Sequence, residues 1–152
     1  MKEPLFIRNN MYIQASPEKV WDALVNPEKT KHYMFGCVTV STWQPGSSLD
    51  WQGQYQGKTM VFVTGQIKEI TAPEKLVYTV FDPNNTEIPN VPENYLEVTY
   101  LLKQVGQGTE LTVTQGDYNK VANGEKRYAE SYNGGEGWNP ILTGIKTLVE
   151  AE

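Results

Sequence analysis

The chain has 152 residues, a net charge of −5, 39% hydrophobic residues and one cysteine, so we expect one domain, residues 1–152, with its own core. The acidic balance argues against a nucleic-acid partner, because a phosphate backbone is bound through a basic face. Cys37 excludes an internal disulfide, and no apolar run reaches the roughly 18 residues of a membrane span, so we expect a cytoplasmic protein without membrane insertion.

The N-terminal part predicts one strand followed by two short helices. Residues 5–14 favour a strand. Ser16 is a good helix N-cap, and Pro17 fits the first helical position, so an amphipathic helix is predicted from there to Asn26. A second short helix is expected over about 28–34.

After Gly36 the pattern changes to the period of two that is typical of strands. Turns rich in Gly, Pro and polar residues separate the runs, which favours antiparallel hairpins. Gly65 inside the longest run indicates a bulge or a close approach of another element. The predicted strands are 37–43, 49–52, 59–70, 76–81, 95–104 and 109–116.

Residues 82–94 contain three prolines, four asparagines and no apolar period, and predict a loop. A loop of this length is usually either functional or disordered. We therefore expect its amides to exchange faster than those of the neighbouring strands.

The C-terminal run 138–150 has its apolar residues at the spacing of one helical face. Residues 125–132 are also compatible with a helix, whereas the glycine-rich run 133–137 predicts a break. Gly144 indicates either a close approach to a neighbour or a position that tolerates solvent. An antiparallel sheet with one apolar face needs a cover, and this helix alone has adequate length. We predict an α+β fold, in which a strongly curved sheet of about six to seven strands wraps around the C-terminal helix.

Five segments support a family resemblance that covers nearly the whole chain. They are Ala15–Leu24, Pro45–Trp51, Gly65–Thr79, Gly108–Thr114, and Gly137-Trp138 with Leu142, Ile145 and Leu148. In this order they resemble the START-like (SRPBCC) helix-grip superfamily and, within it, the activator-of-Hsp-ATPase-homologue-like family. The resemblance implies a helix-grip fold, a cavity between the C-terminal helix and the sheet, and possible chaperone contact with a role in stress response. Tyr33 departs from the pattern, because Trp is common at this place.

Few side chains suggest catalysis. His32 is the only histidine and is interpreted as a surface residue, and Cys37 is interpreted as a small structural hydrophobe. We therefore expect no metal site and no cofactor. Glu97 alternates with apolar neighbours and is expected to face solvent.

The predicted function is binding of a small apolar or amphipathic ligand, such as a lipid, without identified catalysis. One alternative is a polyketide-cyclase-like or hydrolase-like enzyme, whose candidate polar groups are Tyr78, Tyr100 and Glu97. The other is a chaperone-linked protein-interaction module, and either a monomer or a homodimer fits the sequence. The predicted ligand-binding residues are Tyr33, Phe35, Trp51, Tyr78, Tyr100, Trp138, Leu142 and Ile145.

Overall fold

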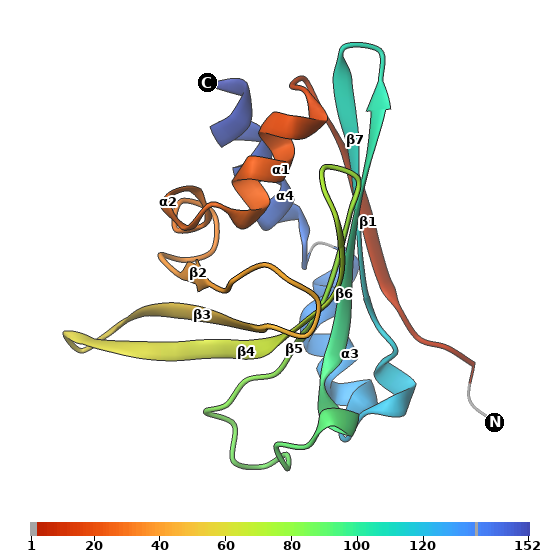
Figure 1. The fold of residues 1–152 in the computed structure, drawn as a ribbon. Coiled ribbons are helices and arrows are strands. Elements are labelled where there is room, and N and C mark those ends of the chain that lie inside the picture. The colour runs from red at the N-terminus through yellow and green to blue at the C-terminus, as the bar shows by residue number, and fades with distance from the viewer. Residues whose placement is uncertain (1–2, 136) are drawn as a thin grey trace.

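The computed structural model describes residues 3–135 and 137–152, and these form an α+β fold around one antiparallel sheet (Figure 1). The sheet has seven strands in the order β1-β7-β6-β5-β4-β3-β2. The strands are β1 Ile7–Ile13, β2 Val38–Val40, β3 Ser48–Tyr55, β4 Lys58–Thr71, β5 Lys75–Val80, β6 Leu96–Val105 and β7 Gly108–Gly116. The α-helices are α1 Pro17–Val25, α2 Pro27–Thr30, α3 Gly124–Tyr132 and α4 Asn139–Glu150, and the 3-10 turns are η1 Pro92–Asn94, η2 Tyr118–Lys120 and η3 Asn133–Gly135. The predicted fold class is confirmed.

The sheet is strongly curved: in Figure 1 the β3–β4 hairpin runs across the direction of β6 and β7. Register irregularities occur between Trp51 and Gln52 of β3, and between Ile67 and Glu69 of β4. Such bulges bend a strand and increase its twist. Gly65 lies in β4, where an added Cβ would come within 1.6 Å of the Thr79 carbonyl oxygen. Of the two alternatives predicted for this glycine, a bulge or a close approach, the close approach is therefore present.

Helix α4 covers the sheet together with α1, which lies beside it in Figure 1. Leu142, Ile145 and Val149 of α4 are buried, and Ile141 and Leu148 are partly buried against the same core. These positions are the apolar face that the sequence predicts. No helix of the described chain combines the length and the apolar character needed to cross a bilayer.

The glycine-rich run separates α3 from α4, as predicted. Gly134 and Gly135 have φ angles of 67° and 89°, in the left-handed region that favours glycine. Glu136 lies outside the described residues. Helix α4 begins at Asn139 instead of residue 138, and Pro140 occupies its first turn, where the missing N–H disrupts no helical hydrogen bond.

Three further segments depart clearly from the predictions. Helix α2 ends at Thr30, so residues 31–34 form a turn and not the end of a helix. Strand β2 stops at Val40, and Trp43 has a φ of 57°, which a strand does not accommodate. The loop 82–94 is partly ordered: it contains η1 and buries Ile88 to 5% exposure.

Candidate ligand cleft

A cleft of about 680 Å³ lies between the sheet and the junction of α3 with α4. Its sheet wall comes from β3, β4, β5, β6 and the end of β7, and residues before β2 and after β5 complete it. The lining residues are Met34, Phe35, Cys37, Trp51, Gln54, Phe62, Val63, Tyr78, Val80, Phe81, Asp82, Asn85, Leu96, Val98, Gln115, Arg127, Glu130, Ser131, Gly137, Trp138 and Ile141.

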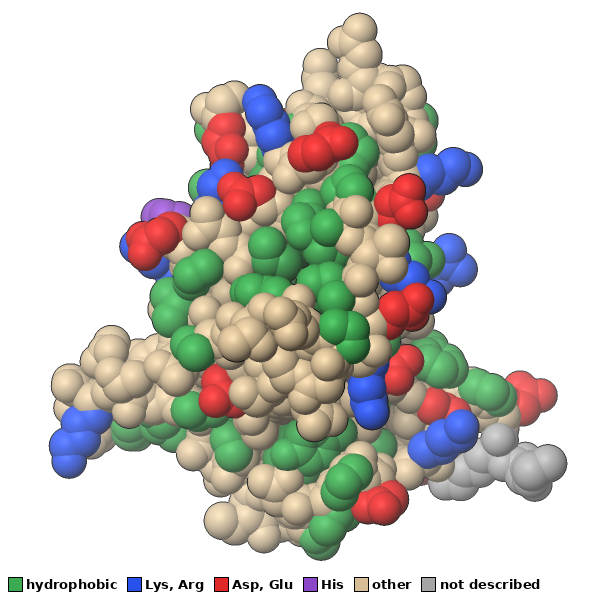
Figure 2. Space-filling model, viewed as in Figure 1, with side chains coloured by type: hydrophobic (Ala, Val, Ile, Leu, Met, Phe, Trp, Pro, Cys, Tyr) green, Lys and Arg blue, Asp and Glu red, His purple; other side chains and the backbone are tan. Residues whose placement is uncertain are grey.

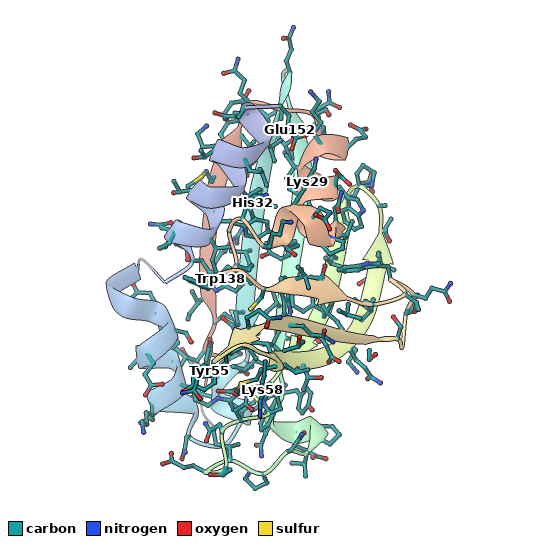
Figure 3. All side chains as sticks on the ribbon, turned by 90° about the vertical axis from the view of Figure 1, so that its left-hand side faces the viewer. Lys29, His32, Tyr55, Lys58, Trp138 and Glu152 are labelled. Atoms are coloured by element: carbon teal, nitrogen blue, oxygen red, sulfur yellow. The ribbon has the colours of Figure 1, made fainter. Side chains whose placement is uncertain are left out.

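Trp138 lies at the junction of the two helices, at the start of α4 (Figure 3). Its indole Nε1 donates a hydrogen bond to Oε1 of Gln115, with an N–O distance of 3.1 Å. Its ring meets the Tyr100 ring edge to face at a centroid distance of 6.0 Å. The polar end of the indole is therefore satisfied, and because the side chain is only 7% exposed, a small part of its apolar body borders the cleft.

A series of aromatic rings connects the cleft with the core. Trp51 and Tyr78 have ring centroids 6.3 Å apart, and Tyr78 and Tyr100 have centroids 6.2 Å apart. Burial raises the pKa of the Tyr78 and Tyr100 hydroxyls, so both are neutral near pH 7. At this pH they can donate or accept a hydrogen bond but cannot act as tyrosinate bases.

The eight predicted site residues fall into two groups. Phe35, Trp51, Tyr78 and Trp138 line the cleft. Tyr33, Tyr100, Leu142 and Ile145 belong to the buried core and are absent from the lining. For Leu142 and Ile145 the physical reason is that only the start of α4 borders the cleft, whereas the rest of this helix packs on α1 and β1. A ligand-binding role for the eight residues remains a prediction.

Phe62 and Val63 also line the cleft, although neither was among the residues predicted from the sequence. Neighbouring strand residues normally face opposite sides of a sheet. Here Trp51 pairs with Val63 while Gln52 pairs with Val61, which leaves Phe62 as the extra residue of a bulge. The bulge brings both side chains to the cleft, and only the hydrophobic character of this strand could have suggested them.

The polar part of the cleft comes from α3 and from the residues after β5. Arg127, Glu130 and Ser131 belong to α3, and Asp82 and Asn85 follow β5. None of these five residues was predicted from the sequence as part of the site. The positions of the three α3 residues depend on the glycine break between α3 and α4, and the sequence pattern shows that the helix breaks there without showing in which direction α3 runs.

Of the three polar groups considered for catalysis, only Tyr78 lines the cleft. Glu97 is exposed, as predicted, and borders a second hollow together with Thr79 and Lys68.

Burial raises the pKa of the Cys37 thiol, which disfavours the reactive thiolate. His32 is exposed, and Figure 2 shows the single histidine at the edge of the molecule beside charged side chains. In the described ranges, His, Cys, Asp and Glu form no group of three or more that could hold a metal ion.

The sequence matches the family described as "Activator of Hsp90 ATPase homolog 1-like protein" over residues 14–150. Among curated proteins, no significant sequence match is found.

Several solved structures are similar to this chain. The solution structure of a protein from Cytophaga hutchinsonii is 37% identical, with 99% of this chain and 97% of that chain covered and a TM-score of 0.74. An HSP90 activator from Plasmodium falciparum is 18% identical, with 96% of each chain covered and a TM-score of 0.68. The Aha1 dimer from Colwellia psychrerythraea is 17% identical, with 96% of each chain covered and a TM-score of 0.68. The last two similarities concern the fold alone.

Proposed function

Because this chain belongs to the family of Activator of Hsp90 ATPase homolog 1-like proteins and has their START-like helix-grip fold, we propose that it binds a small apolar or amphipathic molecule in the cleft. The observation that carries this proposal is the cleft itself, about 680 Å³ of space beside a wall of aromatic side chains. Sites for small ligands usually measure roughly 300–1,000 Å³ and are mainly apolar.

The lining explains which ligands would gain most from this site. Phe35 and Phe62 offer exposed apolar surface, and removing such surface from water is the main favourable term in binding, whereas Trp51 and Trp138 are only 5% and 7% exposed and contribute little of it. Gln54 and Gln115 add amide groups that can orient a ligand. This combination favours a molecule that is mostly apolar and carries a polar end. We also propose a cytoplasmic location and a monomeric or homodimeric state, as expected from the sequence.

Native mass spectrometry of freshly purified protein tests this function directly. We expect the native spectrum to show the protein with a bound apolar molecule, and we expect this added mass to disappear when the protein is denatured. For protein stripped of ligand, we expect decanol to raise the melting temperature with increasing concentration, because a ligand that binds only the folded state stabilises it by mass action. If no mass co-purifies and decanol leaves the melting temperature unchanged, the proposal is wrong.

A second function, contact with a chaperone of the Hsp90 class, is favoured by one surface feature besides the family. Phe35 is 87% exposed although it is a large hydrophobe, and its φ of 55° is unusual for an aromatic residue. Exposed aromatic side chains are frequent anchors of protein interfaces. Phe35→Ser is expected to weaken binding to purified Hsp90 in a calorimetric titration, whereas Tyr12→Ser on β1 is not. Absence of binding by the wild-type protein would contradict this function.

A further inference from the structure

Arg127 is the one cationic residue among the described residues that line the cleft. Its Nη1 donates hydrogen bonds to the carbonyl oxygens of Asn94, at 3.1 Å, and of Ala122, at 3.3 Å. Asn94 is itself held, because its Nδ2 donates to the Pro89 carbonyl and its Oδ1 accepts from the Ala122 amide. The guanidinium is therefore fixed in place before any ligand arrives.

One edge of this guanidinium is free. Arg127 donates both of its hydrogen bonds to described residues from Nη1, so within the described chain the Nε and Nη2 hydrogens have no partner. No Asp or Glu of the described residues forms an ion pair with Arg127. The side chain is half-buried, and this burial lowers its pKa because the charge loses hydration. The Nε–Nη2 edge of an arginine is the fork that receives the two oxygens of a carboxylate.

Two carboxylates also line the cleft and could oppose an anion. Asp82 and Glu130 are both exposed, and Glu130 lies three residues after Arg127 on the same helix. Exposed charges are screened by water and salt, whereas a half-buried charge is screened less. We therefore expect the free edge of Arg127 to favour an anion, with Asp82 and Glu130 weakening this preference.

Building on the proposed function, we propose that the ligand is an anionic amphiphile, whose carboxylate binds the free edge of Arg127 while its apolar tail lies against Trp51, Phe62 and Tyr78. All four side chains line the same cleft: Arg127 and Phe62 are partly exposed, whereas Trp51 and Tyr78, with 5% and 2% exposure, form its buried wall. Arg127 thereby determines which apolar molecules bind, and the aromatic wall supplies affinity that does not depend on the head group.

The test compares three probes with the same tail: decanoate, decanol and decylamine, each titrated calorimetrically at pH 7 and below its self-association concentration. We expect decanoate to bind at least about tenfold more tightly than decanol, since a charge-assisted bidentate contact exceeds a neutral hydrogen bond by this order. Decylamine should bind more weakly than decanol. Arg127→Gln should abolish the preference for decanoate and leave decanol binding within about threefold of wild type.

Two further variants complete the design. Lys126→Gln removes the same charge from the exposed neighbour of Arg127, which does not line the cleft, and should leave the preference for decanoate intact. Glu130→Gln should strengthen decanoate binding, because it removes a like charge from the cleft. The comparison of probes on the wild-type protein needs no variant, so the test holds even if Arg127→Gln fails to fold.

The outcomes separate this inference from the function on which it rests. If decanol binds but decanoate binds no better, or if decylamine is preferred, the role of Arg127 is wrong and cleft binding stands. A loss of the preference in Lys126→Gln as large as in Arg127→Gln would also overturn that role, because a general charge effect would then explain it. If none of the three probes binds, the proposed function fails, and the inference with it.

Discussion

The side chain of Tyr33 caps the C-terminal end of α1. Its hydroxyl donates a hydrogen bond of 2.6 Å to the carbonyl oxygen of Ala23. In a continuing helix this carbonyl would accept from the amide of residue 27, but Pro27 has no amide hydrogen. Burial raises the pKa of the Tyr33 hydroxyl, which keeps the donor proton in place. The position therefore requires a long side chain that ends in a donor.

We predict that Tyr33→Phe destabilises the protein by about 1–3 kcal/mol, because the buried Ala23 carbonyl would lose its partner. Urea unfolding followed by circular dichroism measures this change. Tyr12→Phe, at an exposed tyrosine of β1, serves as the control and should change stability little. Equal stability of the two variants would show that the Ala23 carbonyl finds another partner.

Gly144 provides the close approach of α4 to the turn that carries Tyr33. A Cβ added to Gly144 would lie 2.7 Å from the Tyr33 Cβ, closer than such atoms are found. Of the two interpretations left open by the sequence, close approach is therefore the right one. The same contact explains why this helix keeps a residue with poor helix propensity at its middle.

Gly144→Ala is expected to destabilise the fold, although alanine is the better helix former. The gain in helix propensity is about 1 kcal/mol, whereas overpacking a close contact costs about 1–3 kcal/mol, and the Cβ of Tyr33 is not a flexible chain end. The melting temperature should therefore fall, with Thr143→Ala on the exposed face as the control. A rise in melting temperature would show that the helix can shift away from Tyr33 at low cost.

At the scale of elements, the N-terminal segment is joined to the end of β7 by a carboxylate. Oδ1 of Asp117 accepts hydrogen bonds from the amides of Leu5 and Asn119, both at 2.9 Å. The Tyr118 amide donates in turn to the Leu5 carbonyl at 2.9 Å. The hydrogen bond from Leu5 is the main cause that lowers the pKa of Asp117, and the bond from Asn119 adds to it.

This lowered pKa predicts that the free energy of unfolding depends on pH in the acidic range. The contribution of ionised Asp117 is fully present above the ordinary carboxyl pKa of about 4, and it is lost as the pH falls through the lower pKa of the folded state. The stability difference between wild type and Asp117→Asn should therefore be constant from pH 7 to about pH 5 and shrink below about pH 4. Urea unfolding at each pH measures it. A difference that grows on acidification would contradict this sign.

At the scale of the whole molecule, α4 serves both the cleft and the core. Ile141 lines the cleft near its first turn, whereas Leu142 is fully buried at 0% exposure. A larger side chain at Leu142 would overpack the core, but at Ile141 it would enter open space. Substitutions at Leu142 therefore report on stability, whereas substitutions at Ile141 report on ligand binding.

Ile141→Trp is expected to abolish the rise in melting temperature caused by decanol, because the indole would occupy the cleft. The variant should remain folded, with a native circular dichroism spectrum. Thr143→Trp, on the exposed face of the same helix, should leave the response to decanol unchanged. An unaltered response of Ile141→Trp would place the decanol site outside the cleft.

Several features of this protein follow from the sequence by itself, because they depend on local chemistry. Ser16 and Pro17 begin α1, Gly134 and Gly135 interrupt the last two helices, and a spacing of three and four residues specifies the buried face of α4. Period-two runs separated by turn residues likewise predict the antiparallel strands. Each signal involves residues that are neighbours along the chain, so no knowledge of distant contacts is needed.

Only the tertiary structure decided which side chains meet in the cleft. The bulge at Phe62, the hydrogen bond from Tyr33 to Ala23 and the placement of Arg127 beside Asn94 all depend on segments that are distant in sequence or on the exact register of a strand pair. A shift of one residue reverses the face to which a strand side chain points. Composition could therefore indicate an aromatic cavity, but only the packed sheet and helices determine which aromatic residues, and which cation, line it.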